Sequence, residues 1–271
     1  MKIIFTHVSI LLFVVVATAC GKMESAVPPA PVIPAYQLTP KEAGVLNAFF
    51  DDDAKAFATG NNSVMGINIA RTTSNEIAVD YSKNEVAADA KYKNKTLFVT
   101  AKIVAIQSGI NNEPFLTLNG ANIFQTPQAR FKGNDIDRIS KLGKGQKIYL
   151  ICVVRGEIVG TPMLDGCVFA DAFAEDIKQK ALAKFTSALA GNKEIFNADE
   201  SVIFLSSIYL ARKLNDGSAC ESGSNDKCLL EINKFVDGNK KNDKSNDSKQ
   251  EWTLIVKEFE KYGFVLPKKN K

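Results

Sequence analysis

Residues 96–106 restrict the fold more than any other part of this chain. Their sequence, TLFVTAKIVAI, is rich in β-branched residues and alternates along much of its length, which predicts a long strand. Residues 107–114 follow as a turn. Two shorter strands, at 115–118 and 121–124, flank Asn119-Gly120, a dipeptide that favours a tight hairpin. This stretch therefore predicts three strands in succession.

A short helix and two further strands complete the pattern. Residues 134–142 predict a helix with Asn134 as its cap and glycines at its end. Strands are then predicted at residues 147–154 and 163–170. The order of three strands, one helix and two strands is that of the five-stranded OB barrel. We therefore expect an α+β fold, with an OB-fold β-barrel over residues 74–171.

Helical patterns flank the predicted barrel. Thr39 and Glu42 form a capping box with Pro40 between them, which predicts a helix to about residue 59 within an N-terminal helical segment, residues 39–73. A second capping box, Thr73 and Glu76, predicts a helix to about residue 89. Residues 172–271 are predicted to form a C-terminal helical region that is long enough for a small bundle. Helical periodicity occurs at residues 172–190, 199–214, 228–236 and 250–264. Residues 238–248 are predicted to be a polar, flexible loop.

The beginning of the chain has the pattern of an export signal. An apolar run at residues 3–16 precedes a small-residue cleavage site, residues 17–20. Cys20 resembles the lipid-attachment cysteine of bacterial lipoproteins, which implies a signal peptide at residues 1–19 and a lipid-anchored, proline-rich linker at residues 20–38. The apolar run is shorter than the roughly 20 residues that a membrane span needs. A plain secretory peptide and an uncleaved anchor remain the alternatives.

The lipoprotein resemblance also implies a location in the bacterial cell envelope. The protein would attach to the membrane through palmitate-type lipid on Cys20. Gly21 stands where lipoproteins retained in the inner membrane typically carry Asp. In a Gram-negative cell the resemblance therefore favours the outer membrane, with the protein facing the periplasm.

The histidine content excludes several enzyme classes. His7 is the only histidine of the chain and lies in the predicted signal peptide. Without an imidazole in the mature chain, Ser-His-Asp and Cys-His mechanisms and His-containing zinc sites are excluded. Residues 51–53 are consecutive acids on a predicted helix, so their side chains point in different directions. We expect no enzyme activity, no catalytic residue and no cofactor.

Four cysteines remain after Cys20, and an even number in an exported chain favours disulfides. Cys152 and Cys167 lie in the last two predicted strands, where a hairpin sets them near each other. Cys220 and Cys228 bracket a polar loop. No metal is expected, because these cysteines lie on elements that have no reason to converge. Free buried thiols are the alternative.

A bond between the two strand cysteines sets a register. It places Leu150 opposite Phe169 and Val154 opposite Asp165 in the predicted hairpin.

Several blocks of the sequence resemble a known family. Residues 81–95 (YSKNEVAADAKYKNK), 142–148 (LGKGQKI) and 164–168 (LDGCV) are similar to bacterial tRNA_anti-like OB-fold domains. The resemblance spans residues 74–171, and it implies an OB fold without implying tRNA as a ligand. The chain carries Asn94 where members usually have glycine.

The first of these blocks has two interpretations. Tyr81, Glu85, Asp89 and Tyr92 recur at helical spacing and could pack over the end of the barrel. The alternative is contact with a ligand, and aromatic residues at this spacing are more often part of a core.

OB domains commonly bind ligands on the face of their second and third strands and on neighbouring loops. At these positions the ligand-binding candidates are Phe115, Thr117, Asn119, Phe124, Arg130 and Arg155. The two phenylalanines could stack on a ligand or lie in the interior. Nucleic-acid sites also need a basic groove, and the chain has a net charge of only +4 with dispersed basic residues. The nearest basic cluster is Arg138, Lys141, Lys144 and Lys147.

The leading hypothesis is a non-catalytic, lipid-anchored OB-fold binding module in the periplasm. Its ligand would be an envelope protein or an envelope glycan. The alternative is an inhibitor or exclusion protein that acts on an incoming enzyme or phage component. The electrostatic pattern argues against nucleic acid as a partner.

Overall fold

The computed structural model describes residues 33–63, 69–109, 113–131, 133, 135–223, 225–239 and 246–266. The predictions for Cys20, for the signal peptide and for the cap Asn134 lie outside these residues, as do most of the predicted linker and residues 240–245 of the predicted loop. Every element named below belongs to one compact unit, Ile33–Lys271.

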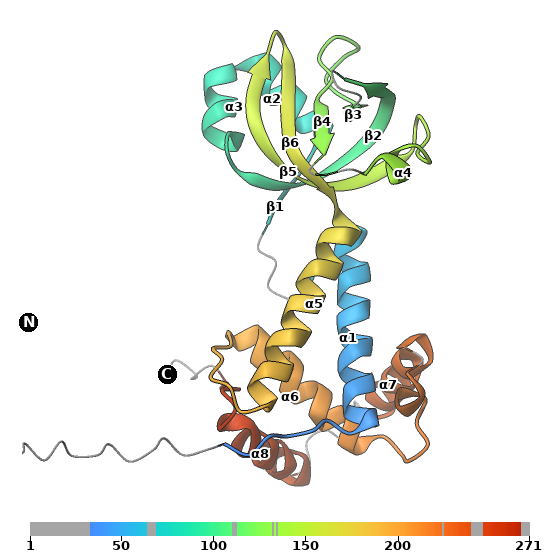
Figure 1. The fold of residues 1–271 in the computed structure, drawn as a ribbon, viewed down its shortest axis with the longest axis vertical. Coiled ribbons are helices and arrows are strands. Elements are labelled where there is room, and N and C mark those ends of the chain that lie inside the picture. Colours follow the sequence, from blue (N-terminus) through green and yellow to red (C-terminus); the bar gives the residue numbers. More distant parts are fainter. Residues whose placement is uncertain are drawn as a thin grey trace, which may run out of the picture. The chain divides into compact units, whose positions relative to one another are not determined.

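The middle of the chain forms the expected closed barrel (Figure 1). Its strands are β2 (Thr96–Ser108), β3 (Pro114–Leu118), β4 (Gln128–Phe131), β5 (Lys147–Ile158) and β6 (Thr161–Phe169). They are ordered β2-β3-β4-β6-β5, and the pairing of β2 with β5 closes the barrel. One further strand, β1 (Ala70–Thr73), runs parallel to the start of β2 and was not expected.

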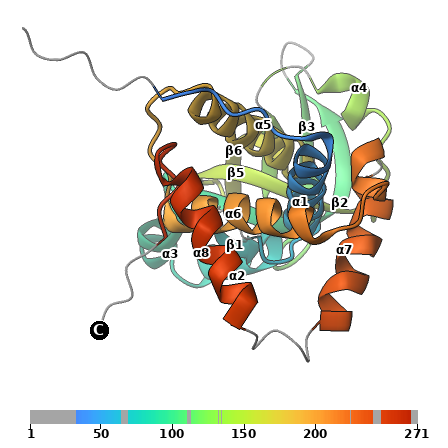
Figure 2. The same ribbon diagram turned by 90° about the horizontal axis from the view of Figure 1, so that it is seen from below.

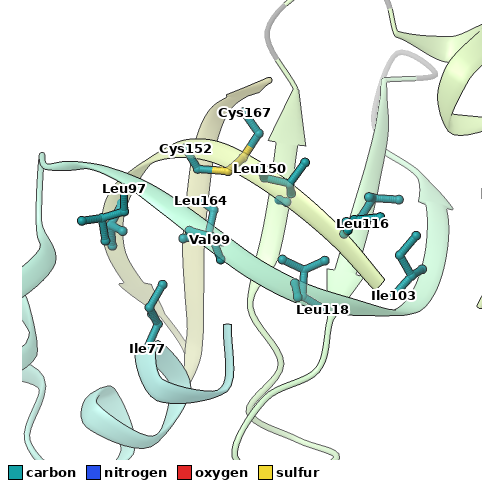
Figure 3. Packing of buried hydrophobic residues seen from close by; sticks show 14 of the residues in the cluster. Ile77, Leu97, Val99, Ile103, Leu116, Leu118, Leu150, Cys152, Leu164 and Cys167 are labelled. Carbon is teal, nitrogen blue, oxygen red and sulfur yellow. A yellow bond between two sulfur atoms is a disulfide. The ribbon is translucent and has the colours of Figure 1, made fainter. Parts of the chain in front are cut away.

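Apolar side chains on the inner face of these strands fill the barrel (Figure 3). Val99, Leu116, Leu118, Leu150 and Leu164 are all completely buried. Successive residues of a strand point to opposite sides, so their sequence neighbours point outward. Strand alternation therefore decides which side chains a ligand can reach.

The prediction of a strand at residues 121–124 was wrong, because the third strand of the barrel is β4. The Asn122 side chain accepts hydrogen bonds from the backbone amides of Phe124 (2.8 Å) and Gln125 (3.0 Å), a local turn that competes with strand pairing. Gly120 lies so close to this turn that a Cβ atom would be 1.7 Å from the Gln125 carbonyl oxygen. Residues 119–127 are therefore a folded loop and not a tight hairpin.

A short helix covers one end of the barrel. Helix α4 (Ile136–Ile139) is shorter than the predicted segment 134–142, and its cap Asp135 makes no side-chain hydrogen bond. Ile139 is buried in the barrel core, and Leu142 packs against the same core.

Two helices stand where the sequence predicted one. Helix α2 (Ser74–Lys83) starts at the expected capping box, and α3 (Glu85–Tyr92) follows after a break at Asn84. Asn84 has an extended backbone, and its side chain accepts a hydrogen bond from the Ala87 amide at 3.1 Å. This residue therefore ends one helix and caps the next.

Both expected disulfides are present. Cys152 and Cys167 join β5 to β6 inside the barrel, with their Cα atoms 4.2 Å apart (Figure 3). Cys220, in a 3-10 turn at Ala219–Ser222, is bonded to Cys228. All four cysteines are buried.

The predicted register between β5 and β6 is correct at one end only. Leu150 lies opposite Phe169 as expected, whereas Asp165 lies opposite Val153 rather than Val154. The register shifts because Gly166 adds one residue to β6. Its φ of +57° is the left-handed conformation that a β-bulge of this kind requires.

The remaining helices form a bundle that combines both ends of the chain. Helix α1 (Pro40–Ala58) packs against α5 (Ala170–Leu189), α6 (Ala198–Lys213) and α7 (Asn225–Asn239), as Figure 2 also shows. Helix α8 (Asn246–Glu260) completes this bundle. The C-terminal helices therefore share two apolar clusters with α1.

The end of the predicted linker belongs to the same bundle. The Tyr36 amide donates a hydrogen bond to the Leu189 carbonyl at 2.7 Å, and the Tyr262 hydroxyl donates one to the Pro34 carbonyl at 2.7 Å. Ile33, Tyr36 and Leu38 pack against the bundle core. Residues 33–38 are thus bound to the folded part.

The outer side of β2 and β5 is partly covered by helices. Phe57 of α1 and Ala174 of α5 share an apolar cluster with Phe98 and Ile151 of these strands. A ligand cannot reach these barrel positions.

Candidate binding face on the outer side of the barrel

Strands β3 and β4 present one row of side chains inward and another outward. Leu116, Leu118 and Ala129 are fully buried in the core. Phe115 and Thr117 of β3 are half-buried on the outer side, and Arg130 of β4 is exposed there. The structure thus places three of the six candidates on one surface.

These three side chains are cross-strand neighbours. Phe115 lies opposite Gln107 of β2 on one side and opposite Arg130 of β4 on the other. Thr117 lies opposite Gln128 of β4, and its hydroxyl donates a hydrogen bond to the Gln107 side-chain carbonyl at 2.7 Å. We call Gln107, Phe115, Thr117, Gln128 and Arg130 the β3–β4 face.

The β3–β4 face continues onto β6. Ala129 lies opposite Leu164 in the parallel pair of β4 and β6, so the next outward positions, Arg130 and Asp165, are adjacent. Among the residues that the structure describes, Arg130 has no ion-pair or hydrogen-bond partner. Its guanidinium is therefore available to a ligand.

Arg155 lies further around the same side of the barrel. Its Nε atom is 3.4 Å from a carboxylate oxygen of Asp165, and its Nη1 atom is 3.3 Å from the side-chain oxygen of Asn94. The side chains of Arg155 and Asp165 are 53% and 48% exposed. An exposed pair of this kind is weakly held, so Arg155 can exchange Asp165 for an anionic ligand.

The side chain of Asn119 has a structural role. Its side-chain oxygen accepts hydrogen bonds from the Lys102 amide at 2.6 Å and from the Ser74 hydroxyl at 2.8 Å. These bonds fix the end of β3 to β2 and to the start of α2. Asn119 is therefore removed from the ligand-binding candidates.

Phe124 lies outside the core. It is 81% exposed in the loop between β3 and β4, next to Ile123, which is 83% exposed. The structure thus decides the question left open by the sequence, because neither Phe115 nor Phe124 is a core residue.

The family-like block at residues 81–95 serves the scaffold. Tyr81 and Tyr92 are buried in the barrel core cluster. The Tyr81 hydroxyl donates to Asp89 at 2.9 Å, and the Tyr92 hydroxyl donates to Asp80 at 2.6 Å. Burial raises the pKa of Tyr81, so its hydroxyl stays protonated and remains a donor.

Sequence reasoning missed Gln107, Gln128 and Asp165. Gln128 was missed because the third strand was placed too early in the chain. Once β4 is located, the alternation of side chains along a strand places both Gln128 and Arg130 on its outer side. The described residues contain no cluster of three metal-ligating side chains and no helix that is long and apolar enough to cross a membrane.

A barrel with five strands, a short helix after the third strand and a flanking helix pair is an OB-fold protein. Residues 1–168 match the tRNA_anti-like family, and the chain belongs to this family. No curated protein matches the chain. The chain is also similar to a crystal structure of a lipoprotein from Klebsiella pneumoniae subsp. pneumoniae, whose name ascribes nucleic-acid binding to it. The two sequences are 18% identical and the TM-score is 0.31. The match covers 36% of this chain and 91% of that one.

Proposed function

We propose that this protein is a non-catalytic lipoprotein of the bacterial cell envelope that binds an envelope protein or glycan through its β3–β4 face. The observation that carries the proposal is the outward-facing pair of the half-buried Phe115 and the exposed Arg130 on that face. An aromatic ring beside an unpaired guanidinium offers stacking, cation and hydrogen-bond contacts in one place. Aromatic residues, phenylalanine included, and arginine are also enriched at protein interfaces.

The amide side chains of the face support the same function. Gln107 and Gln128 flank the central pair and carry donors and acceptors, which suit hydroxyl groups and peptide groups. The acid Asp165 borders the face, so the described residues form no continuous basic groove of the kind that a nucleic-acid strand needs.

The proposed location is based on the N-terminal sequence and on the cysteines. The export pattern before Cys20 resembles a lipoprotein signal. Two disulfides among the remaining cysteines are typical of an oxidising compartment such as the periplasm. Delivery to the outer membrane is part of the proposal.

Site-specific photo-crosslinking in intact cells tests the proposed function. A photoreactive residue at Gln128 should form adducts, whereas the same residue at Lys180, on α5, should not. Arg130→Ala should reduce the adduct yield at position 128, and Lys180→Ala should leave it unchanged. Digestion with protease or with glycan-cleaving enzymes then identifies the adduct.

Two results would contradict the proposal. One is an equal adduct yield at positions 128 and 180. The other is an adduct that contains nucleic acid.

A further inference from the structure

Another surface of the barrel carries positive charge without compensation. Lys102 of β2 and Lys147 of β5 are directly opposite each other in the antiparallel pair of these strands. Both are exposed, and neither has an ion-pair partner in the described part of the chain. Like charges at directly opposed positions, roughly 5 Å apart at Cβ, destabilise a sheet.

A hollow of about 250 Å³ is lined by one member of this pair, Lys147, and Lys102 lies directly across the strands from it. The hollow is bordered by the end of α1, by α4 and the segment that follows it, and by the ends of β5 and β6. Its polar lining includes Lys147, Arg138 and Gln146, and its aromatic lining consists of Tyr149 and Phe169. The hollow is separate from the β3–β4 face.

Ring contacts orient the two cations of the lining. The Arg138 guanidinium carbon is 3.6 Å from the centre of the Phe169 ring, and the Lys147 ammonium is 4.9 Å from the centre of the Tyr149 ring. Such contacts hold cations over aromatic faces without neutralising them.

One acid belongs to the lining. Asp171 accepts a hydrogen bond from Arg138 at 2.8 Å, so it compensates a single cation. Lys147 and the neighbouring Lys102 retain their charges. The exposed Lys141 and Lys144 lie on the segment between α4 and β5 and add positive potential.

Gln146 supplies a neutral donor. Its side-chain oxygen already accepts a hydrogen bond from the Gly143 amide at 3.0 Å. This bond fixes the orientation of the side chain and leaves its NH2 group as the part that can donate to a ligand.

We propose that this hollow binds a phosphate group through Lys147, Arg138 and Gln146 of its lining, with Lys102, opposite Lys147, as a further cation at its edge. A phosphate has several strong acceptor oxygens and matches donors that approach from several sides. Bound phosphate also removes the repulsion between the two lysines. The remainder of the ligand would contact Tyr149.

The volume limits the size of the ligand. Sites for drug-sized molecules are commonly about 300–1,000 Å³, so a hollow of about 250 Å³ takes one phosphate with a small substituent. A free phosphate ester and a phospholipid headgroup both have this chemistry.

Titration of the mature lipoprotein in neutral-detergent micelles tests the phosphate site. One arm adds inorganic phosphate or pyrophosphate, and the other adds phosphatidylglycerol to the micelles. Sodium chloride at equal ionic strength is the reference. NMR shifts of the Gln146 and Tyr149 amides should saturate in at least one arm and stay unchanged with chloride, and the responsive arm identifies the source of the phosphate.

Charge-removing variants connect binding to the lysine pair. Lys102→Gln and Lys147→Gln should each weaken binding about tenfold, because each removes one charge-assisted hydrogen bond. Both side chains are exposed, so the fold should persist, which circular dichroism checks. Lys193→Gln removes an exposed lysine elsewhere and is the matched control.

Two results would overturn the phosphate site. The first is no saturable shift in either arm. The second is equal binding by all three variants, so that Lys102→Gln and Lys147→Gln bind phosphate as strongly as the control Lys193→Gln.

Discussion

Phe115 lies directly opposite Arg130 across strands β3 and β4, on the outside of the barrel. The pair places a half-buried aromatic ring beside an exposed guanidinium that has no ion-pair or hydrogen-bond partner among the described residues. Strand alternation points Leu116 and Ala129, the neighbours of these residues, into the core. The same packing that stabilises the barrel therefore presents the β3–β4 face to a partner.

Phe124→Ala should reduce partner capture and leave stability nearly unchanged. Phe124 is 81% exposed and belongs to no core cluster, so its truncation should change the free energy of unfolding by less than about 0.5 kcal/mol. Urea unfolding and capture from solubilised envelopes measure the two effects. A large loss of stability would show that the ring packs against the protein.

Arg155→Ala should likewise affect binding more than folding. Its exposed contact with Asp165 contributes little to stability, within about 1 kcal/mol. Lys193→Ala, which removes an exposed cation outside both proposed sites, controls for general effects of charge. Capture that is equal in the two variants would exclude a specific role for Arg155.

The barrel could be predicted from the sequence because the patterns that indicate its strands and flanking helices depend on residues close together in the chain. Each capping box depends on two residues three positions apart, as at Thr73 and Glu76. The period of two along β2 likewise needs no knowledge of distant residues.

The errors arose where a side chain or a distant contact decides the structure. The Asn122 side chain turns the chain where β-propensity favoured a strand, and Gly166 inserts a bulge that shifts the register. The shared core of α1 and the C-terminal helices joins residues such as Phe50 and Phe204. No sequence period reports a contact between segments so far apart.

Cys20→Ser should release the protein from membranes and abolish metabolic labelling with palmitate. The reason is the export pattern that ends at this cysteine. The folded part should be unaffected, because the compact unit begins at Ile33. Membrane fractionation and thermal unfolding measure the two results. Continued labelling of the variant would contradict lipid attachment at Cys20.

Asp80→Asn should lower stability at neutral pH more than at pH 3. Hydrogen bonds from Lys91 (2.8 Å) and then from Tyr92 (2.6 Å) lower the pKa of Asp80 below its ordinary value of 3.8. A carboxylate whose pKa is lower in the folded state stabilises the protein at pH values above its unfolded-state pKa. This stabilisation is lost as the pH falls through the folded-state pKa. The stability difference between the two proteins should therefore shrink below about pH 4.

Asp176→Asn is the control for this pH dependence. Asp176 is 56% exposed and pairs with Lys180 on one helix, so its replacement should have a smaller effect at every pH. Urea unfolding at a series of pH values gives the comparison. Parallel pH profiles for wild type and Asp80→Asn would contradict the proposed role of this carboxylate.

Removal of the barrel disulfide should destabilise the protein more than removal of the bundle disulfide. Cys152 and Cys167 are 15 positions apart, whereas Cys220 and Cys228 are 8 apart. Loop closure alone predicts losses of about 3 and about 2.5 kcal/mol. Both pairs lie in buried apolar clusters, so replacement of the sulfurs loses packing contacts at each site and the loop length sets the expected order.

Double Cys→Ala variants of each pair, unfolded in urea, measure this difference. Peptide mapping without reduction should first find Cys152 linked to Cys167 and Cys220 linked to Cys228 in protein from its native envelope. Four free thiols there would refute both bonds. A loss of stability for the Cys220–Cys228 variant that equals or exceeds the loss for the Cys152–Cys167 variant would contradict the order expected from loop length.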